Sequence, residues 1–244
     1  MDKMDIRWFL KQRLDFIRIH YDCSASAFLN TVRQIENGEA PFDTPPYTED
    51  GEPAFQKQWE DANTSIDLIG ISCVSLLSDA LKLYLNSLKR IEFRFEFDET
   101  EQKALKNGYV FAFKAALGKI LNTDWVESGV DFEILEQVVL ARNQGQHGND
   151  ITGFRFKIDA KTIRQHPRPI FGRTEEIEAM DGQDLAVNNF LGIAMKIDRA
   201  SLFSAIDEIE KLSDWVELNR ERALPWFEKQ RFLRQARAEP RSNS

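Results

Sequence analysis

The chain has 244 residues, of which 42% are hydrophobic, and its formal net charge at pH 7 is −8. This length provides enough apolar side chains for a large core, and we predict a single domain over residues 1–244. The negative charge argues against broad, non-specific attraction to nucleic acid, although a local basic patch could still bind phosphate. The two cysteines, Cys23 and Cys73, have no second cysteine or histidine at metal-ligand spacing, which suits a reducing compartment and excludes a disulfide framework.

No segment resembles a secretory signal or predicts a membrane-spanning helix. The first residues lead directly into an amphipathic pattern, without the apolar stretch and small-residue cleavage site of a signal peptide. The longest uncharged apolar run, residues 68–78, is far shorter than the ~20 residues that cross a bilayer. We therefore expect a soluble, cytoplasmic protein with no membrane partner.

Hydrophobic periodicity predicts two long helices in the first part of the chain. Apolar residues at spacings of three, four and seven predict a helix over residues 6–37. Residues 38–53 hold four of the eight prolines and predict a Pro-rich surface loop. A second helix over residues 55–91 is apolar nearly all round its middle, which is typical of a central helix.

Three further helices are predicted downstream. Acidic residues at 98–101 favour the positive end of a helix dipole, and the apolar pattern continues this helix to residue 120. Residues 130–144 and 199–219 have one apolar face each, and Pro225 is predicted to interrupt the chain beyond residue 219. Residues 220–244 contain seven basic and three acidic side chains, so we predict a basic C-terminal tail, solvated or frayed, with a phosphate-binding patch as the alternative.

Three short segments alternate between apolar and polar residues: 93–97, 154–158 and 193–197. This period of two, with aromatic and β-branched residues, predicts strands and a small accessory sheet. Residues 159–189 contain prolines and glycines and are predicted to be irregular, so residues 151–197 form an irregular, β-containing insertion. The predicted fold class is mostly α, with long N-terminal and C-terminal helices and a small accessory β element.

The sequence lacks the motifs of the commonest nucleotide-binding, hydrolase and zinc-protease sites, and we predict no cofactor or metal. The three histidines are His20, His147 and His166. His20 flanks the apolar stripe of the first helix and His166 lies alone in the irregular segment, so we expect structural roles for both. Tyr109 and Trp125 could stack on bases, but aromatic residues at helical spacing are usually core.

His147 ends the run Arg142-Asn143-Gln144-Gly145-Gln146-His147, which closes the helix predicted at residues 130–144. Arg142 follows the apolar Val138 and Val139 by one turn, so it lies at the edge of the buried face. Asn143 and His147 are four residues apart and share a side if the helix continues. This set suits phosphodiester chemistry without a metal, because arginine binds phosphate oxygens and histidine exchanges protons near neutral pH.

These residues resemble the HEPN domain family (higher eukaryotes and prokaryotes nucleotide-binding), whose signature is an arginine, then four to six residues, the first of them often polar, and then a histidine. Arg142-Asn143-x-x-x-His147 matches that form, and the resemblance covers residues 55–150 best. It implies a helical bundle in which two such motifs meet across a homodimer interface and cut RNA without metal; many members are toxins or phage-defence effectors. Arg13 and His20 are a second formal match, but they lie inside one continuous helix.

HEPN relatives sometimes place acidic and basic groups on the second helix to orient the arginine, and Asp79 with Lys82 could take that part. We favour ordinary surface pairing of Asp79 with Lys82, which are three residues apart.

The leading hypothesis is a HEPN-type endoribonuclease in which Arg142 stabilises the scissile phosphate, His147 is the general acid or base, and Asn143 positions one of them. Its partners would be RNA, a second copy and, if it is a toxin, an antitoxin or other defence partner chain. The alternative is a non-catalytic, HEPN-like binding or dimerisation module.

Overall fold

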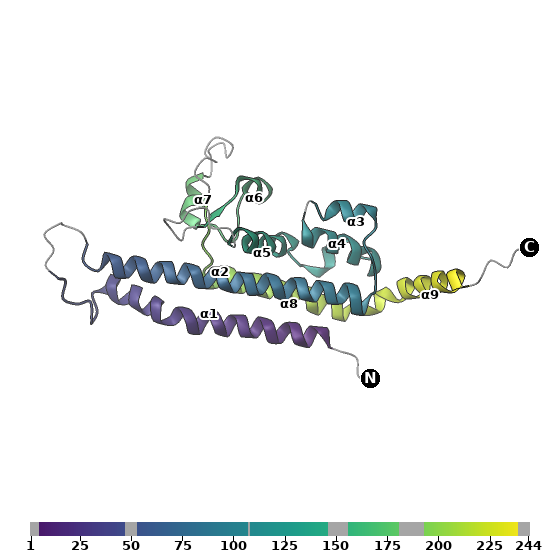
Figure 1. Cartoon of the computed structure of the whole chain (residues 1–244), viewed down its shortest axis with the longest axis horizontal. Helices are drawn as coiled ribbons and strands as arrows, with labels where there is room; N and C mark the ends of the chain where they lie inside the picture. The colour runs from purple at the N-terminus through teal and green to yellow at the C-terminus, as the bar shows by residue number, and fades with distance from the viewer. Residues whose placement is uncertain (1–4, 47–52, 107, 146–155, 181–192, 239–244) are drawn as a thin grey trace, which may run out of the picture. The chain divides into compact units, whose positions relative to one another are not determined.

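The structure is a computed structural model of the chain, and it describes residues 5–46, 53–106, 108–145, 156–180 and 193–238 (Figure 1). It is mostly α-helical, as the sequence predicts, and the part of the chain described has one two-stranded sheet. The Cα positions divide the chain into two compact units. The first unit comprises Met1–Lys11, Leu81–Glu136 and Asp207–Ser244, and the second comprises Gln12–Ala80 and Gln137–Ile206.

Four helices begin and end within a few residues of the predicted positions. They are α1 (Ile6–Asn37), α2 (Gln56–Ser87), α5 (Phe132–Gly145) and α8 (Arg199–Leu218). Each has residues in both units. Helices of this length carry several repeats of the apolar pattern, which is why their existence and type could be predicted from the sequence.

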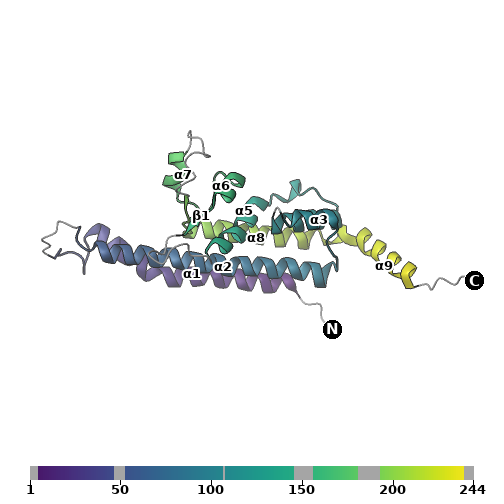
Figure 2. The same cartoon turned by 45° about the horizontal axis from the view of Figure 1, so that its top comes forward.

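In the second unit, α1 and α2 run side by side in opposite directions, as both views show (Figures 1 and 2). Leu14, Ile17 and Tyr21 of the predicted apolar stripe of α1 are buried, whereas Phe9 and Phe28 of the same stripe are exposed. The Trp59 indole donates a hydrogen bond to Glu36 at 3.0 Å where the two helices approach the predicted loop. The described part of that loop, residues 38–46 and 53, contains no helix.

The small sheet of the second unit consists of β1 (Lys157–Ile158) and β2 (Ile193–Ala194), which pair antiparallel with Lys157 opposite Ala194. Two of the three predicted strands are thus present in shortened form, although residues 154 and 155 lie outside the described residues. A Cβ at Gly70 of α2 would overlap the carbonyl oxygen of Ile197, so glycine permits the chain after β2 to lie directly on α2.

The prediction that residues 159–189 are irregular is wrong for two short helices, α6 (Ala160–Gln165) and α7 (Thr174–Met180). The Asp159 side chain caps α6 by accepting a hydrogen bond from the Thr162 backbone at 2.7 Å. Helices of fewer than two turns show no measurable periodicity, so the capping residue was the only local signal in the sequence. Residues 181–192 lie outside the described part of the chain.

The predicted single helix over residues 98–120 is in fact two helices of the first unit, α3 (Glu99–Ala104) and α4 (Tyr109–Ile120). The start at Asp98 is confirmed: Asp98 and Glu101 form a reciprocal capping box. The break arises because the buried Glu136 carboxylate accepts hydrogen bonds from the backbone of Tyr109 at 3.2 Å and of Val110 at 2.7 Å. Glu136 therefore caps the start of α4, where Gly108 is the N-cap residue.

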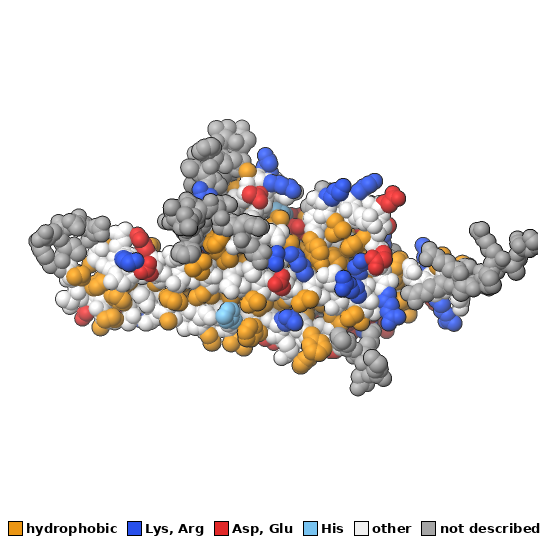
Figure 3. Space-filling model, viewed as in Figure 1, with side chains coloured by type: hydrophobic (Ala, Val, Ile, Leu, Met, Phe, Trp, Pro, Cys, Tyr) orange, Lys and Arg blue, Asp and Glu red, His pale blue; other side chains and the backbone are white. Residues whose placement is uncertain are grey.

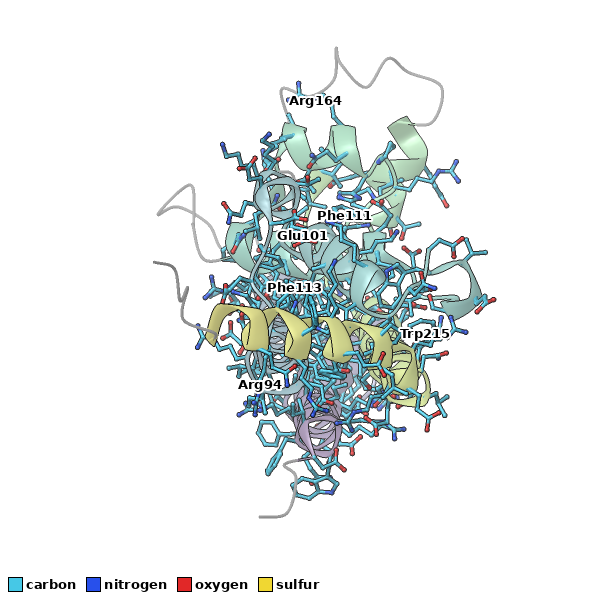
Figure 4. The ribbon with its side chains drawn as sticks, turned by 90° about the vertical axis from the view of Figure 1, so that its right-hand side faces the viewer. Arg94, Glu101, Phe111, Phe113, Arg164 and Trp215 are labelled. Atoms are coloured by element: carbon cyan, nitrogen blue, oxygen red, sulfur yellow. The ribbon has the colours of Figure 1, made fainter. Side chains whose placement is uncertain are left out.

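The predicted strand at residues 93–97 is also wrong. A π-helix, η1 (Leu88–Glu92), extends α2, and the segment after it contains no strand. Burial does alternate, since Phe93 and Phe95 are buried while Arg94 is exposed, but Arg94 has the left-handed φ of 50°, which breaks a strand. The ring of Phe95 contacts that of Phe113, which lies in the packed interior of this unit (Figure 4). The alternation thus reflected burial rather than strand pairing.

Two short 3₁₀ helices, η2 (Val126–Ser128) and η3 (Arg220–Ala223), and a final helix, α9 (Leu224–Ala238), complete the first unit. Pro225 does not interrupt the chain as predicted. It is the second residue of α9, in the first turn, where its missing N–H needs no partner. The Trp226 indole donates to the Phe93 carbonyl at 3.2 Å, which fixes the start of α9. The predicted basic tail is therefore helical to residue 238, where the described residues end.

The continuous helix Gln56–Glu92 is long and apolar enough to cross a membrane, with a mean hydropathy of 1.6 over its most apolar window of 18 residues. Half of that window is buried inside the protein, as is usual for the core helix of a soluble protein. The structure is therefore compatible with a soluble protein.

Candidate functional site

Arg142 lies in the last turn of α5, within the second unit. Val138 and Val139, one turn earlier, are 0% and 4% exposed, as their predicted place on the core face requires. The Arg142 side chain is 28% exposed. The arginine therefore lies at the boundary between core and solvent, where one end of its guanidinium can face water.

The carboxylate that approaches Arg142 comes from α2. The Nε atom of Arg142 lies 3.9 Å from Oδ1 of Asp79, which makes an ion pair too long for a hydrogen bond. Among the described residues, Nε is buried and has no hydrogen-bond partner. The sequence favoured pairing of Asp79 with Lys82, whereas the structure brings Asp79 to the arginine.

Asn143 is exposed and follows Arg142 directly. Its Oδ1 lies 3.5 Å from Nη1 of Arg142, at the outer limit of a hydrogen bond. The guanidinium is thus approached by a carboxylate at Nε and by an amide oxygen at Nη1. Two of the three predicted site residues are adjacent in space, and the third, His147, lies in residues 146–155, outside the described residues.

The end of α5 is held by side chains that no sequence motif singles out. Gln144 Nε2 donates hydrogen bonds to Asp159 Oδ2 at 2.9 Å and to Thr162 Oγ1 at 2.8 Å. Burial raises the pKa of the Asp159 carboxyl, but hydrogen bonds from Thr162 and Gln144 together lower it below its ordinary value. An ionised Asp159 therefore links α5 to α6. The only sequence signal was the spacing Asp159-x-x-Thr162, typical of a helix cap.

Gly145, the last described residue of α5, fixes how closely this helix end approaches α2. A Cβ at Gly145 would lie 2.8 Å from Cγ2 of Ile71, closer than real Cβ atoms come. Gln144 and Gly145 together therefore restrain the turn that carries Arg142 and Asn143.

The other two histidines lie in structural surroundings. The His20 ring stacks on Phe16 with centroids 5.9 Å apart, and its Nδ1 lies 3.4 Å from Ser24 Oγ. His166 is 6% exposed at the C-terminal end of α6. Arg13 lies with His20 in the uninterrupted α1, so this second match has no helix end comparable with that of Arg142.

Of the two aromatic residues considered for base stacking, Trp125 belongs to the core of the first unit. Trp125 is 5% exposed, and its ring lies 5.0 Å from that of Phe132 and 4.8 Å from that of Trp215, which is labelled in Figure 4. Burial raises the pKa of Tyr109 to about 12. The core interpretation is confirmed for Trp125, whereas Tyr109 is only partly buried. The described residues contain no cluster of histidine, cysteine and carboxylate side chains that could hold a metal ion.

An open hollow of about 730 Å³ lies in the first unit, beside α4 and η2. Three cations line it, and each is engaged. Lys114 lies 4.7 Å above the Phe132 ring, Lys119 is paired with Asp98, and Arg222 is paired with Glu127 at 3.0 Å. Unlike Arg142, therefore, none of these three cations combines partial exposure with a buried, unsatisfied N–H group.

Comparisons with protein families, with curated proteins and with solved structures find no match to this chain.

Proposed function

We propose that this chain is a metal-independent endoribonuclease of the HEPN type that acts as a homodimer. The observation that carries the proposal is the ion pair between Arg142 and Asp79, with 3.9 Å between Nε and Oδ1. The carboxylate approaches one edge of the guanidinium, and the side chain is 28% exposed. The remaining N–H groups can therefore bind two oxygens of a phosphate in the bidentate geometry that arginine favours.

The proposed roles follow from the chemistry of each group. Arg142 binds the non-bridging oxygens of the scissile phosphate, and Asp79 is a positioning residue that keeps the other edge of the guanidinium turned outward. His147 is the general base or acid, because imidazole exchanges protons near neutral pH. Asn143, whose amide oxygen lies 3.5 Å from Nη1, orients the arginine or the substrate.

In the proposed reaction the 2′-oxygen of a ribose attacks the adjacent phosphorus while the bond from phosphorus to the 5′-oxygen breaks. The 2′-hydroxyl proton passes to the base, and a proton from an acid reaches the leaving 5′-oxygen. The products are a 2′,3′-cyclic phosphate and a 5′-hydroxyl. One arginine and one histidine per chain supply half of the groups, and the resemblance to HEPN proteins implies that a second copy supplies the rest.

The proposed setting is the cytoplasm, where the protein would act as a toxin or phage-defence effector. Its substrate would be RNA, and an antitoxin or another defence protein would restrain it.

The test is incubation of RNA with the pure protein in excess chelator. Cleavage should persist in the wild type and be lost in Arg142→Ala and His147→Gln. Arg164→Ala is the matched control, because Arg164 is an exposed arginine on the outer surface of α6 in the same unit (Figure 4). Cleavage that survives Arg142→Ala, or that is lost equally in Arg164→Ala, would contradict the proposal.

The alternative is a non-catalytic helical binding or dimerisation module. It is favoured by the burial of Arg142 Nε, since the ion pair with Asp79 would then serve only to hold the end of α5 on α2. In that case Arg142→Ala would lower the free energy of unfolding, and the wild type would show no RNA cleavage to lose.

A further inference from the structure

The N-terminal helix α1 has two apolar faces, and only one of them is covered. The buried face carries Leu10, Leu14, Ile17, Tyr21 and Ala25. On the opposite side four large side chains are more than half exposed: Trp8 at 53%, Phe9 at 51%, Phe16 at 60% and Ile19 at 61%. Figure 3 shows hydrophobic side chains gathered along α1 at the lower edge of the view. We call the exposed side the outer face of α1.

The outer face has the spacing of a coiled-coil seam. Phe9, Phe16 and Cys23 follow one another at intervals of seven residues, and Ile19 comes three residues after Phe16. These residues occupy a positions and one d position of a heptad repeat, the pattern by which one helix packs against another, while the other two d positions, Gln12 and Ser26, are polar. The large buried residues occupy the b and f positions on the other side, so the same helix can pack on its own chain and on a partner at once.

The apolar area of this face matches what a dimer requires. Large side chains of this kind present about 200 Å² each when fully exposed, so the four residues offer about 450 Å². A standard interface covers about 800 Å² per partner, of which about 60% is apolar, or roughly 480 Å². Single exposed apolar residues are normal on protein surfaces, but a continuous patch of this size marks an interaction site.

The charges beside the seam identify a second copy in parallel orientation as the partner. Asp15 and Asp22 flank one side, where Asp22 is already paired with Arg199 of its own chain at 2.7 Å, and Arg13 and His20 flank the other. In a parallel pair these two sides face each other, which brings Asp15 to the partner's His20. In an antiparallel pair the side with Asp15 and Asp22 would face the same side of the partner, and so would the side with Arg13 and His20. Side chains of like charge would then lie next to each other.

Asp15 is available for this contact. Its present partner is Arg18 at 3.5 Å on the same helix, and the Asp15 side chain is 58% exposed. Exposed pairs of this kind contribute little to stability and rearrange easily. Arg13 is exposed as well, and in the parallel pair it faces the partner's Trp8, where a cation–π contact can form.

We propose that two copies of this chain associate in parallel through the outer faces of α1. Phe9 and Phe16 pack on their counterparts along the seam, and Cys23 lies opposite the Cys23 of the other copy. The outer face of α1 does not contain Arg142, so this contact is separate from the one through which the proposed function brings two Arg142 motifs together. A monomeric wild type would contradict both proposals, whereas a wild-type dimer that tolerates Ile19→Glu would overturn this one alone.

The first measurement is the mass of the full chain by sedimentation. The wild type should be a dimer, and Ile19→Glu should weaken self-association roughly a hundredfold, because it places an unpaired charge in the seam. Val126→Glu is the matched control, since Val126 is 80% exposed but belongs to η2 and not to α1. A monomeric wild type, or a dimer that tolerates Ile19→Glu, would overturn the proposal.

The second measurement is cross-linking with a short bismaleimide, which reports orientation. Cys23 is exposed and Cys73 is buried, with a pKa raised to about 11 by burial, so only Cys23 should react. Efficient formation of a covalent dimer, absent in Cys23→Ser, supports the parallel pair. A dimer that yields no such product would exclude it, because an antiparallel pair centred on Phe16 would separate the two thiols by about 20 Å.

Discussion

Replacement of Glu136 by glutamine tests how the first unit divides one predicted helix into two. The Glu136 side chain is 3% exposed, and its carboxylate accepts hydrogen bonds from Tyr109 at 3.2 Å and Val110 at 2.7 Å. Hydrogen bonds to a charged group contribute about 1.5–3 kcal/mol each. A negative charge at a helix start adds about 0.3–1 kcal/mol. Glutamine keeps one acceptor oxygen but turns an NH₂ group toward the second N–H.

We therefore expect Glu136→Gln to lower the free energy of unfolding by about 2–4 kcal/mol, measured by urea denaturation at pH 7. Glu133→Gln is the control, because Glu133 is an exposed residue of the same helix, and it should change stability by less than about 1 kcal/mol. If the two variants were equally stable, the capping of α4 by Glu136 would be refuted.

Three further predictions concern the second unit. Gly70→Ala should lower the thermal midpoint by several degrees, because its Cβ would overlap the Ile197 carbonyl; an unchanged midpoint would contradict that close approach. Asp159→Asn should make the free energy of unfolding depend less on pH in acid. The lowered pKa of Asp159 stabilises the fold above about pH 4, and this stabilisation is lost as the pH falls through the folded-state pKa. Acid unfolding curves that coincide for the two proteins would refute the link from Gln144 to Asp159. Native protein should bind one equivalent of maleimide rather than two, since burial raises the pKa of Cys73 to about 11, and rapid reaction of both thiols would show that this side chain is accessible.

The long helices were predictable because each repeats its apolar pattern over several turns, as α1 does at Leu14, Ile17 and Tyr21. The errors arose where a residue distant in sequence decides local structure. Glu136 divides α3 from α4 across 26 residues of chain from Val110, and no local window contains both. The segment after α2 shows a second kind of error. Its alternating Phe93 and Phe95 are buried, but no neighbouring strand pairs with them among the described residues.

The candidate site was predictable in part. The position of Arg142 at the edge of the core follows from Val138 and Val139 one turn earlier. Its pairing with Asp79 depends on how α5 packs on α2, and sequence spacing between the two residues carries no information about that. The hydrogen bond from Gln144 to Asp159 could not be predicted either, because Asp159 caps α6, a helix too short to show an apolar periodicity.

In the proposed function, Arg142 serves phosphodiester cleavage by an adjacent 2′-hydroxyl. The most direct measurement uses a defined RNA and a copy in which the nucleotide 5′ to the cut carries a 2′-O-methyl group, both incubated with the protein in excess chelator. We expect the unmodified RNA to be cut to a 2′,3′-cyclic phosphate, whereas neither the modified bond nor the Arg142→Ala protein should give cleavage. Cleavage at the methylated position, or an unmodified RNA left intact by the wild type, would contradict it.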